Sequence, residues 1–562
     1  MRHHFRKLIS VLLILTVIVI PLSLTAQAAG NPFTDVKDTA WYKKAVDYVY
    51  EHKMFSGIGN NRFAPNGTMT RSMFVTVLSN ISNDDPKNEK IQHFADVDPN
   101  AWYFQAVEWA AKYSVVAGTG KFRFSPNEKI TREQMATMLY RYALATGNVG
   151  ESGASKAIGK YTDGNKVSDY AVKAMVWAVE NKIIVGRSST ELAPKEDTTR
   201  AEAAQIFMNA SKLFKTTKII VPEVELEVPD KIDMTMALMS QDEKIGQLFL
   251  ARYSDDKTAK TEISTYHPGG YIFFEKDFKN KNKAQVQNMT GSIQNLAKVP
   301  MFTAVDEEGG TVVRVSSNKK LSDSKFQSIR DVYNMGGLDA LTHDTQAKDK
   351  LLKSLGLNLN LGPVCDVTTD KNAFMFARSL GDTPERTATA IGHIVSLMNN
   401  DKISCTLKHF PGYGNNKDTH KESATDNRPL DTLKNNDLVV FQKAIDNKAP
   451  SVMMSHMIVS SIEKNVPVSL SPKAHKFLRN DMKFEGVIMT DDLSMGAITE
   501  YTQQDAAAKA FRAGNDMIIT SNLKTDFESI KNAVETKQIS MDNINESVRR
   551  ILEWKLDKGL IE

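Results

Sequence analysis

Two patterns of apolar and polar residues divide the chain. Up to about residue 214, apolar residues recur at helical spacing in short stretches, as at Val46 and Val49 and again at Phe74 and Val77. After about residue 233, short apolar runs alternate with longer amphipathic stretches. The first pattern predicts short helices, and the second predicts strands that alternate with helices.

The first part of the chain contains three similar segments. Each has an aromatic-x-Asp start, then a helical stretch that ends at a Gly, a Pro eight residues after that Gly, and a Thr-Arg pair whose Arg stands six residues after the Pro. We expect the Gly to be a left-handed helix cap and the Thr to be the N-cap of a second helix. Such a small unit buries little surface alone, so the three should share a core. The positions are Asp35, Asp96 and Asp163; Gly57, Gly118 and Gly186; Pro65, Pro126 and Pro194; Thr70, Thr131 and Thr199; and Arg71, Arg132 and Arg200.

This pattern resembles the S-layer homology domain, with repeats at residues 31–90, 91–152 and 158–214. The resemblance implies a mostly helical, three-part module that binds pyruvylated secondary cell-wall polysaccharide. A guanidinium group suits an anionic ketal carboxylate, which it can bind through two parallel hydrogen bonds. The alternative is that these arginines only pair with neighbouring acids or cap helices. The expected polymer-binding residues are Arg71, Arg132, Arg200, Trp41 and Trp102.

The second part, residues 233–562, predicts an α/β fold of the (β/α)8 TIM-type barrel class. Between the strands lie helical segments such as Ala284–Leu296, Leu338–Leu355 and Pro384–Met398. An open doubly wound sheet is the alternative, and the lack of a Gly-x-Gly-x-x-Gly turn argues against it. The predicted strands are Gly246–Ala251, Gly270–Phe274, Met301–Val305, Leu357–Val364, Ile403–His409, Val452–Met457, Val487–Thr490 and Asp516–Thr520. Two prolines and alternating Glu and Val at residues 215–232 predict an extended, semi-rigid linker before the barrel.

Polar residues follow the predicted strands, where a barrel of this class carries its function. Acids and bases that gather at one rim suit a polyhydroxylated ligand, because carboxylates accept from sugar hydroxyls and Lys and Arg donate to them. No spacing convincingly predicts a metal site, and we expect no metal and no cofactor. The strand-end segments are Asp306-Glu307-Glu308-Gly309-Gly310, Cys365-Asp366, Lys408-His409-Phe410-Pro411-Gly412, Ser455-His456 and Thr490-Asp491-Asp492-Leu493-Ser494-Met495.

These segments resemble glycoside hydrolase family 3, specifically its bacterial β-N-acetylglucosaminidases, over about residues 235–560. The resemblance implies that Asp491 is the nucleophile and that Asp492 is structural, bonding nearby backbone. It implies that the acid/base is His420, a histidine on a loop, with Asp418 as its partner. The implied sugar-binding residues are Asp306, Arg314, Arg378, Lys408 and His409.

These roles are chemically consistent with retaining hydrolysis. A carboxylate attacks the anomeric carbon and forms a covalent glycosyl-enzyme, while a second group first gives and then takes a proton. His420 titrates near the working pH, and Asp418 can orient its imidazole and stabilise its charged form. A rival assignment gives the proton transfer to a carboxylate such as Glu308.

We therefore expect a surface-anchored retaining exo-β-N-acetylglucosaminidase that acts on peptidoglycan-derived glycans. Its partners would be N-acetylglucosamine-containing cell-wall glycans as substrate and pyruvylated secondary cell-wall polysaccharide as anchor. The enzymatic alternatives are a β-glucosidase or β-xylosidase, which the Asp418-x-His420 pair disfavours, and a phosphorylase. An inactive wall-binding, lectin-like protein is the alternative from another class, and the intact Asp491 argues against it.

The first residues predict a secretory signal peptide at residues 1–28. Basic residues within 2–7 precede the apolar run Leu8–Leu24, and Ala26-Gln27-Ala28 is a small-x-small cleavage site. A retained membrane anchor is the alternative. We expect a secreted protein at the cell wall or cell surface, associated with the S-layer and without membrane contact after cleavage.

Charge and cysteine content narrow the possible partners. The formal net charge is +4, and removing Arg2, Arg6 and Lys7 with the signal peptide lowers it to +1. A balance so close to neutral does not suggest nucleic acid as a partner. Cys365 and Cys405 are the only cysteines of the sequence. They predict two buried thiols or one bridge rather than a disulfide framework.

Overall fold

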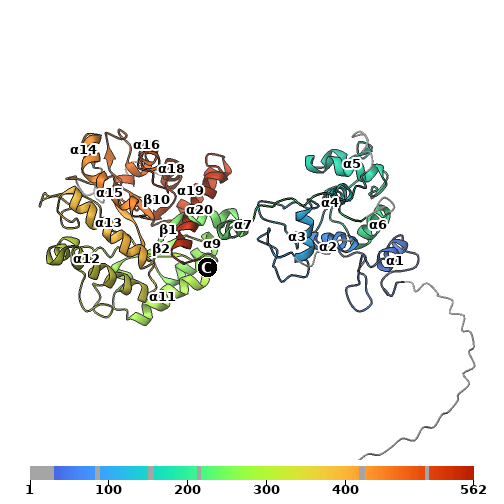
Figure 1. The fold of residues 1–562 in the computed structure, drawn as a ribbon, viewed down its shortest axis with the longest axis horizontal. Coiled ribbons are helices and arrows are strands. Elements are labelled where there is room, and N and C mark those ends of the chain that lie inside the picture. Colours follow the sequence, from blue (N-terminus) through green and yellow to red (C-terminus); the bar gives the residue numbers. More distant parts are fainter. Residues whose placement is uncertain are drawn as a thin grey trace, which may run out of the picture. The chain divides into compact units, whose positions relative to one another are not determined.

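The computed structural model describes residues 31–82, 89–149, 157–211, 217–416, 424–499 and 505–561. These residues form two compact units, one within Met1–Pro229 and one within Asp230–Glu562 (Figure 1). The predicted signal peptide at residues 1–28 lies outside the described residues. In the described part of the chain, every helix is too short or too polar to span a bilayer.

The first unit is built mainly of short helices, two to a repeat. A buried apolar core runs through all three repeats and includes Phe74, Trp109 and Trp177. Shared burial therefore supplies the stability that one repeat lacks. The α-helices are α1 (Lys43–Glu51), α2 (Arg71–Ile81), α3 (Phe104–Lys112), α4 (Arg132–Ala145), α5 (Val172–Glu180) and α6 (Arg200–Ala210).

A closed triangle of backbone hydrogen bonds joins the repeats just before their second helices. Met69 N–H donates to the Thr198 carbonyl (3.0 Å), Thr198 N–H to the Ile130 carbonyl (3.0 Å), and Ile130 N–H to the Met69 carbonyl (2.9 Å). Each repeat donates once and accepts once, so the three are arranged around one centre. The predicted N-caps are confirmed, because the side-chain oxygen of each threonine accepts a backbone N–H three residues later: Thr70, Thr131 and Thr199.

The prediction that the repeated glycines are left-handed helix caps is wrong. The left-handed residues after the first helices are Lys53, Ser114 and Lys182. Glycine is needed at the predicted positions for space instead, since a Cβ on Gly118 would lie 2.5 Å from the Arg123 carbonyl oxygen. The same crowding by backbone and by the ring of the repeat's opening aromatic residue occurs at Gly57 and Gly186.

The described part of the predicted linker packs on the first unit. Ile220 N–H donates to the Ala145 carbonyl (2.8 Å) and Val224 N–H to the Lys112 carbonyl (2.9 Å), while Ile219 is buried. The last two linker residues, 231 and 232, already belong to helix α7 (Lys231–Leu238), whose N-cap is Asp230. The segment is thus extended, and its backbone is bound to its own unit over part of its length.

The second unit is a barrel of parallel strands, which confirms the predicted fold class. Within the described residues, each of the eight predicted runs contributes a strand, and the run Ile403–His409 contributes two short pieces, β5 and β6. The strands are β1 (Phe249–Arg252), β2 (Gly270–Phe273), β3 (Phe302–Val305), β4 (Leu359–Asn360), β5 (Ser404–Cys405), β6 (Leu407–Phe410), β8 (Ser451–Met454), β10 (Val487–Thr490) and β11 (Ile518–Thr520). A small rim pair, β7 (Thr425–Asp426) and β9 (Ile458–Val459), lies outside this set.

The pairing closes the ring. One sheet runs in the order β11-β1-β2-β3-β4-β5 and another in the order β10-β8-β6. Parallel bridges join Val364 to Lys408 and Met489 to Met517, and these connect the two sheets. The first strand begins at Phe249, three residues later than predicted, because residues up to Gln247 form helix α8 (Gln241–Gln247).

Helices cover the outside of this barrel. The helix predicted from Leu338 is the second part of α12, which is interrupted by non-helical backbone at Gly336 and Gly337. The remaining helices are α9 (Asp256–Tyr266), α10 (Glu275–Phe278), α11 (Lys283–Leu296), α12 (Ile329–Ser354), α13 (Pro384–Asn400), α14 (Leu430–Asn435), α15 (Asp437–Asp446), α16 (Pro472–Lys476), a π-helix (Phe477–Asp481), α17 (Gly496–Thr499), α18 (Ala506–Ala513), α19 (Leu523–Glu535) and α20 (Met541–Asp557).

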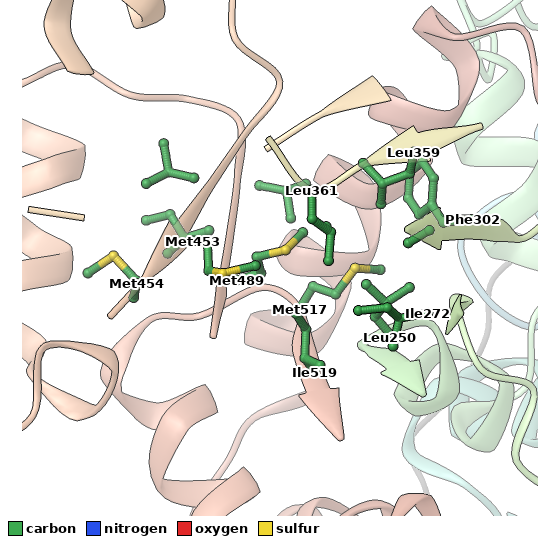
Figure 2. Packing of buried hydrophobic residues seen from close by; sticks show 14 of the residues in the cluster. Leu250, Ile272, Phe302, Leu359, Leu361, Met453, Met454, Met489, Met517 and Ile519 are labelled. Atoms are coloured by element: carbon green, nitrogen blue, oxygen red, sulfur yellow. The ribbon is translucent and has the colours of Figure 1, made fainter. Parts of the chain in front are cut away.

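Apolar side chains from the strands fill the barrel interior (Figure 2). Leu250, Ile272 and Phe302 come from β1 to β3, and methionines such as Met453 and Met489 come from the opposite strands. A packed interior leaves the C-terminal rim as the place for a site. Both cysteines, Cys365 and Cys405, are buried free thiols, so the disulfide alternative is excluded.

Candidate active site

A cavity of about 380 Å³ opens at the C-terminal ends of the strands. Its walls carry Arg252 from β1, Phe274 after β2, and acids and bases from β3, β6 and β10. Every described residue that the sequence predicted for catalysis or sugar binding lines this one cavity: Asp306, Arg314, Arg378, Lys408, His409 and Asp491. Parallel strands bring these residues together, although they are up to 185 positions apart in the sequence (491 − 306).

A network of buried ion pairs forms one wall of the cavity. Lys408 Nζ lies 2.7 Å from Asp306 Oδ1 and 2.6 Å from Glu308 Oε1. Arg378 donates two hydrogen bonds to Glu308, from Nη2 to Oε1 (2.7 Å) and from Nε to Oε2 (2.9 Å). Arg314 stands further out, with Nη2 3.9 Å from Asp306 Oδ2. Two carboxylates and two close cations hold one another in place, as buried charges require.

The pKa values of Glu308 and Lys408 are shifted in the directions that keep both side chains charged. Burial alone would raise the pKa of Glu308, but the charges and hydrogen bonds of Lys408 and Arg378 hold it well below its usual range. Burial alone would lower the pKa of Lys408, but Asp306 and Glu308 raise it. Glu308 and Lys408 therefore act as a fixed acceptor and a fixed donor, with no proton to take or give near neutral pH.

His409 is oriented from behind the cavity by Asp366. His409 Nδ1 lies 2.9 Å from Asp366 Oδ2, and the other oxygen of Asp366 accepts the Tyr413 N–H (2.7 Å). His409 Nε2 is 3.4 Å from Arg378 Nη2. Because a carboxylate can only accept, the contact with Asp366 places a proton on Nδ1, and Nε2 is the ring nitrogen that faces Arg378.

Asp491 and Asp492 follow β10 and have different environments. Asp491 Oδ1 accepts the N–H of Asp492 (2.8 Å), and its side chain lines the cavity. Asp492 accepts the Ser494 N–H (2.9 Å) and the Ser521 hydroxyl (3.0 Å). The predicted contact of Asp492 with nearby backbone is thus present, and Asp492, like Asp491, lines the cavity.

Asp418 and His420 lie outside the described residues, but the two stems that flank their predicted loop, residues 412–416 and 424–428, are described. Arg428 joins these stems: Nη2 donates to the Gly412 carbonyl (3.1 Å), and Nε donates to Asp426 (2.8 Å). Arg428 Nη1 also binds the buried Asp437 (2.7 Å). These contacts fasten both stems at the rim.

For two residues of the site, the sequence did not predict the role that the structure shows. Glu308 is the centre of the ion-pair wall, and Asp366 orients His409. Both stand at predicted strand ends, in Asp306-x-Glu308 and Cys365-Asp366, so their position was a usable signal. Their partners could not be read from the sequence, because they come from other strands.

In the first unit, the three Thr-Arg arginines are buried in contacts that we did not predict. Arg71, Arg132 and Arg200 are 3%, 3% and 9% exposed. Each reaches into another repeat and donates to two backbone carbonyls, as when Arg132 binds those of Leu192 (3.0 Å) and Val185 (2.6 Å). Arg71 binds repeat two, and Arg200 returns to repeat one. The arginines thus join the repeats. Among the described residues, only Arg132 of the three also has a carboxylate oxygen within 4 Å, that of Glu202 at 3.8 Å.

The predicted aromatic ligand positions differ from these arginines. Trp41 and Trp102 are 64% and 65% exposed, although each ring has a tyrosine beside it. Exposed tryptophans of this kind offer flat apolar faces to a ligand.

Comparison with known proteins places both parts of the chain in families. The glycosyl hydrolase family 3 N-terminal domain matches residues 240–554, and the S-layer homology domain matches residues 32–72, 93–136 and 160–204. Since the first match covers more than half of the chain, the chain belongs to glycosyl hydrolase family 3, with three S-layer homology repeats before the catalytic domain.

Several relatives resemble the second unit. Beta-hexosaminidase LpqI of Mycobacterium tuberculosis is 26% identical over 332 residues, which are 57% of this chain and 84% of that protein. A beta-hexosaminidase of Xanthomonas campestris pv. campestris is 31% identical over 232 residues, 41% of this chain and 69% of that one. Among solved structures, a glycoside hydrolase family 3 beta-N-acetylglucosaminidase from Paenibacillus sp. str. FPU-7 matches with a TM-score of 0.54 and 27% identity. That match covers 57% of this chain and 63% of the Paenibacillus chain.

Among the described residues, no group of three or more His, Cys, Asp or Glu side chains is arranged to hold a metal ion.

Proposed function

We propose that this chain is a surface-anchored, retaining exo-β-N-acetylglucosaminidase that acts on peptidoglycan-derived glycans. Its family and its β-hexosaminidase relatives make it a glycoside hydrolase of the β-N-acetylhexosaminidase type. The proposal adds the mechanism, the natural substrate and the anchor. The observation that carries it is one rim cavity in which Asp491 stands with the ion-paired network of Asp306, Glu308, Arg378 and Lys408.

In the proposed reaction, the Asp491 carboxylate attacks the anomeric carbon. The glycosidic C–O bond breaks, and the departing oxygen takes a proton from a general acid. Water then attacks the glycosyl ester, gives its proton to the same group and releases the sugar with its configuration retained. We assign the proton transfers to His420, with Asp418 as the carboxylate that orients it.

The environment of Glu308 supports this assignment. A general acid must hold a proton near the working pH. The pKa of Glu308 lies well below its usual range, and its oxygens are bound by Arg378 and Lys408. Glu308 is therefore unsuited to the rival role, which supports the assignment of the proton transfers to His420. An imidazole also does not repel an acidic leaving sugar such as N-acetylmuramic acid.

The N-terminal module is proposed to hold the enzyme on pyruvylated secondary cell-wall polysaccharide. The exposed Trp41 and Trp102 can stack on sugar rings, as aromatic faces do with apolar sugar surfaces. The buried arginines place positive charge beneath the surface between repeats, which favours an anionic ketal. The proposed location is the cell surface, without membrane contact. It rests on this anchor and on cleavage of the predicted signal peptide.

The activity is tested with the full chain and chromogenic β-N-acetylglucosaminide and β-glucoside, each with and without phosphate. We expect hydrolysis of the first substrate, independent of phosphate, with release of the β-anomer. A preference for the glucoside would indicate a β-glucosidase, and dependence on phosphate would indicate a phosphorylase. Binding without turnover by the intact chain would support the lectin-like alternative.

The anchor is tested by sedimentation of the full chain with purified walls. We expect the chain to pellet with walls that carry pyruvylated polymer and to stay in solution when the ketal groups have been removed. Binding that is indifferent to the ketal would contradict the proposed anchor and leave the enzymatic proposal intact.

A further inference from the structure

We infer that His456 is a positioning residue for the nucleophile. The inference rests on the proposed role of Asp491. His456 is 1% exposed and is absent from the described residues that line the cavity, so it acts through another residue and not on the substrate.

The location of His456 follows from the pairing of two strands. β8 and β10 lie side by side in register, with Met454 opposite Thr490. Asp491 N–H donates to the Met454 carbonyl (3.2 Å), so the chain after β8 runs beside the turn after β10. His456, two residues after Met454, is thereby brought against the residues that follow the nucleophile.

Both nitrogens of the His456 ring are bound. Nε2 lies 3.0 Å from the carbonyl oxygen of Asp492, and Nδ1 lies 2.8 Å from the Ser469 hydroxyl. A carbonyl can only accept, so Nε2 must carry a proton. Ser469 is itself fixed, because its N–H donates to the Ser455 carbonyl (3.0 Å). The ring is therefore a rigid donor aimed at one backbone atom.

Through this carbonyl oxygen of Asp492, His456 influences the position of the Asp491 carboxylate. The N–H of Asp492 donates to Asp491 Oδ1, and the carbonyl of Asp492 accepts from His456. The first peptide group that flanks Asp492 is thus held by the nucleophile. The second is held by His456 and by two backbone bonds: Met495 N–H also donates to the Asp492 carbonyl (3.1 Å), and Leu493 N–H donates to the Ile519 carbonyl (3.2 Å). Without the His456 donor, the Asp492 carbonyl keeps the Met495 N–H but loses its side-chain donor, so the second peptide group can tilt and shift the first away from the attacking carboxylate.

The test compares variants of the full chain on an activated aryl β-N-acetylglucosaminide. His456→Phe keeps the ring and removes the donor, and we expect kcat to fall about 10²-fold, the scale of a misplacement of about 1 Å, with KM changed less than about threefold. His456→Gln keeps an N–H donor, and we expect its kcat to stay within about tenfold of wild type. Ser469→Ala removes the support of the ring and should lower kcat by an intermediate factor.

A matched control is His475→Gln. His475 is also a buried imidazole, bonded through Nδ1 to the Ser471 carbonyl (2.8 Å), but it does not touch the turn after β10. Its kcat should stay within about twofold of wild type, since this variant keeps the His456 donor and its bond to the Asp492 carbonyl.

Two results would overturn the inference. In the first, His456→Phe keeps kcat within about threefold of wild type, or, if that variant does not fold, Ser469→Ala leaves kcat unchanged. In the second, His456→Gln is as inactive as His456→Phe and loses one limb of the pH profile, which would make His456 a proton-transfer group.

Covalent labelling separates failure of this inference from failure of the proposed function. A 5-fluoro glycosyl fluoride of N-acetylglucosamine should label Asp491 in the wild type and label it more slowly in His456→Phe. If the wild type is labelled at another residue, the proposed nucleophile and this inference both fail. If Asp491 is labelled equally fast in both chains, only the role of His456 fails.

Discussion

Replacing the buried lysine Lys555 by methionine should stabilise the barrel, and the gain should depend on pH. Lys555 lies in α20, is 0% exposed, and has its Nζ 2.7 Å from Gln247 Oε1 and 5.3 Å from the centre of the Phe302 ring. Burial lowers its pKa from 10.5 to about 7. The ammonium form is therefore disfavoured in the folded protein relative to the unfolded chain.

The sign and size of this pH dependence of the unfolding free energy follow from proton linkage. Between about pH 7 and 10.5 the unfolded chain binds more protons at this residue than the folded chain, so the wild type becomes more stable as pH rises through this window. At about 1.4 kcal/mol per pKa unit, the wild type should gain about 2–3 kcal/mol between pH 6 and pH 9 from this group. Methionine does not titrate, so Lys555→Met should not show this gain in stability between pH 6 and pH 9. It also leaves Gln247 Oε1 unpaired, which costs about 1–3 kcal/mol.

The assay is urea-induced unfolding followed by loss of hydrolytic activity, which reports on the barrel and not on the first unit. We expect Lys555→Met to exceed the wild type in unfolding free energy by about 1–4 kcal/mol at pH 6 and to lose about 2–3 kcal/mol of that difference at pH 9. Gln247→Met at the same two pH values controls for the lost hydrogen bond. Parallel pH dependences for Lys555→Met and wild type would refute the reasoning.

Three further predictions concern the site and the repeats. Asp491→Asn should retain less than about a tenth of wild-type kcat, a loss above about 1.4 kcal/mol, with an unchanged melting profile; greater activity would contradict the nucleophile assignment. His420→Ala should lose about 10²–10⁴-fold on a sugar leaving group and much less on dinitrophenolate, and azide should restore turnover where deglycosylation limits; an equal loss for all leaving groups without rescue would move the proton transfer elsewhere. Arg132→Ala should destabilise the first unit by about 2–4 kcal/mol, because it removes two charge-assisted hydrogen bonds to buried carbonyls. Calorimetry of the full chain should show this shift in the transition of the first unit only, whereas the exposed Arg123→Ala should change little.

Much of the fold could be predicted from local patterns. Strand β10 lies at the predicted residues Val487–Thr490, because a short apolar run bounded by Gly486 and Asp491 has few other stable conformations. The threonine caps were predictable for the same local reason, since each cap bonds a backbone N–H three residues later. The glycine caps were predicted wrongly, because Gly57 is required by the distant Phe33 ring and not by its own helix.

The sequence by itself determined the two-part architecture, the barrel class and which residues lie at the rim of the barrel. Periodicity and position at the end of a strand are local properties of the sequence. Only the tertiary structure decided how the rim residues are used. It made Glu308 a permanently charged member of a wall, it placed Asp366 behind His409, and it buried Arg132 between repeats. These roles depend on contacts between residues far apart in the chain. Burial and charge pairing set the protonation state of a side chain, and both exist only after the chain has folded.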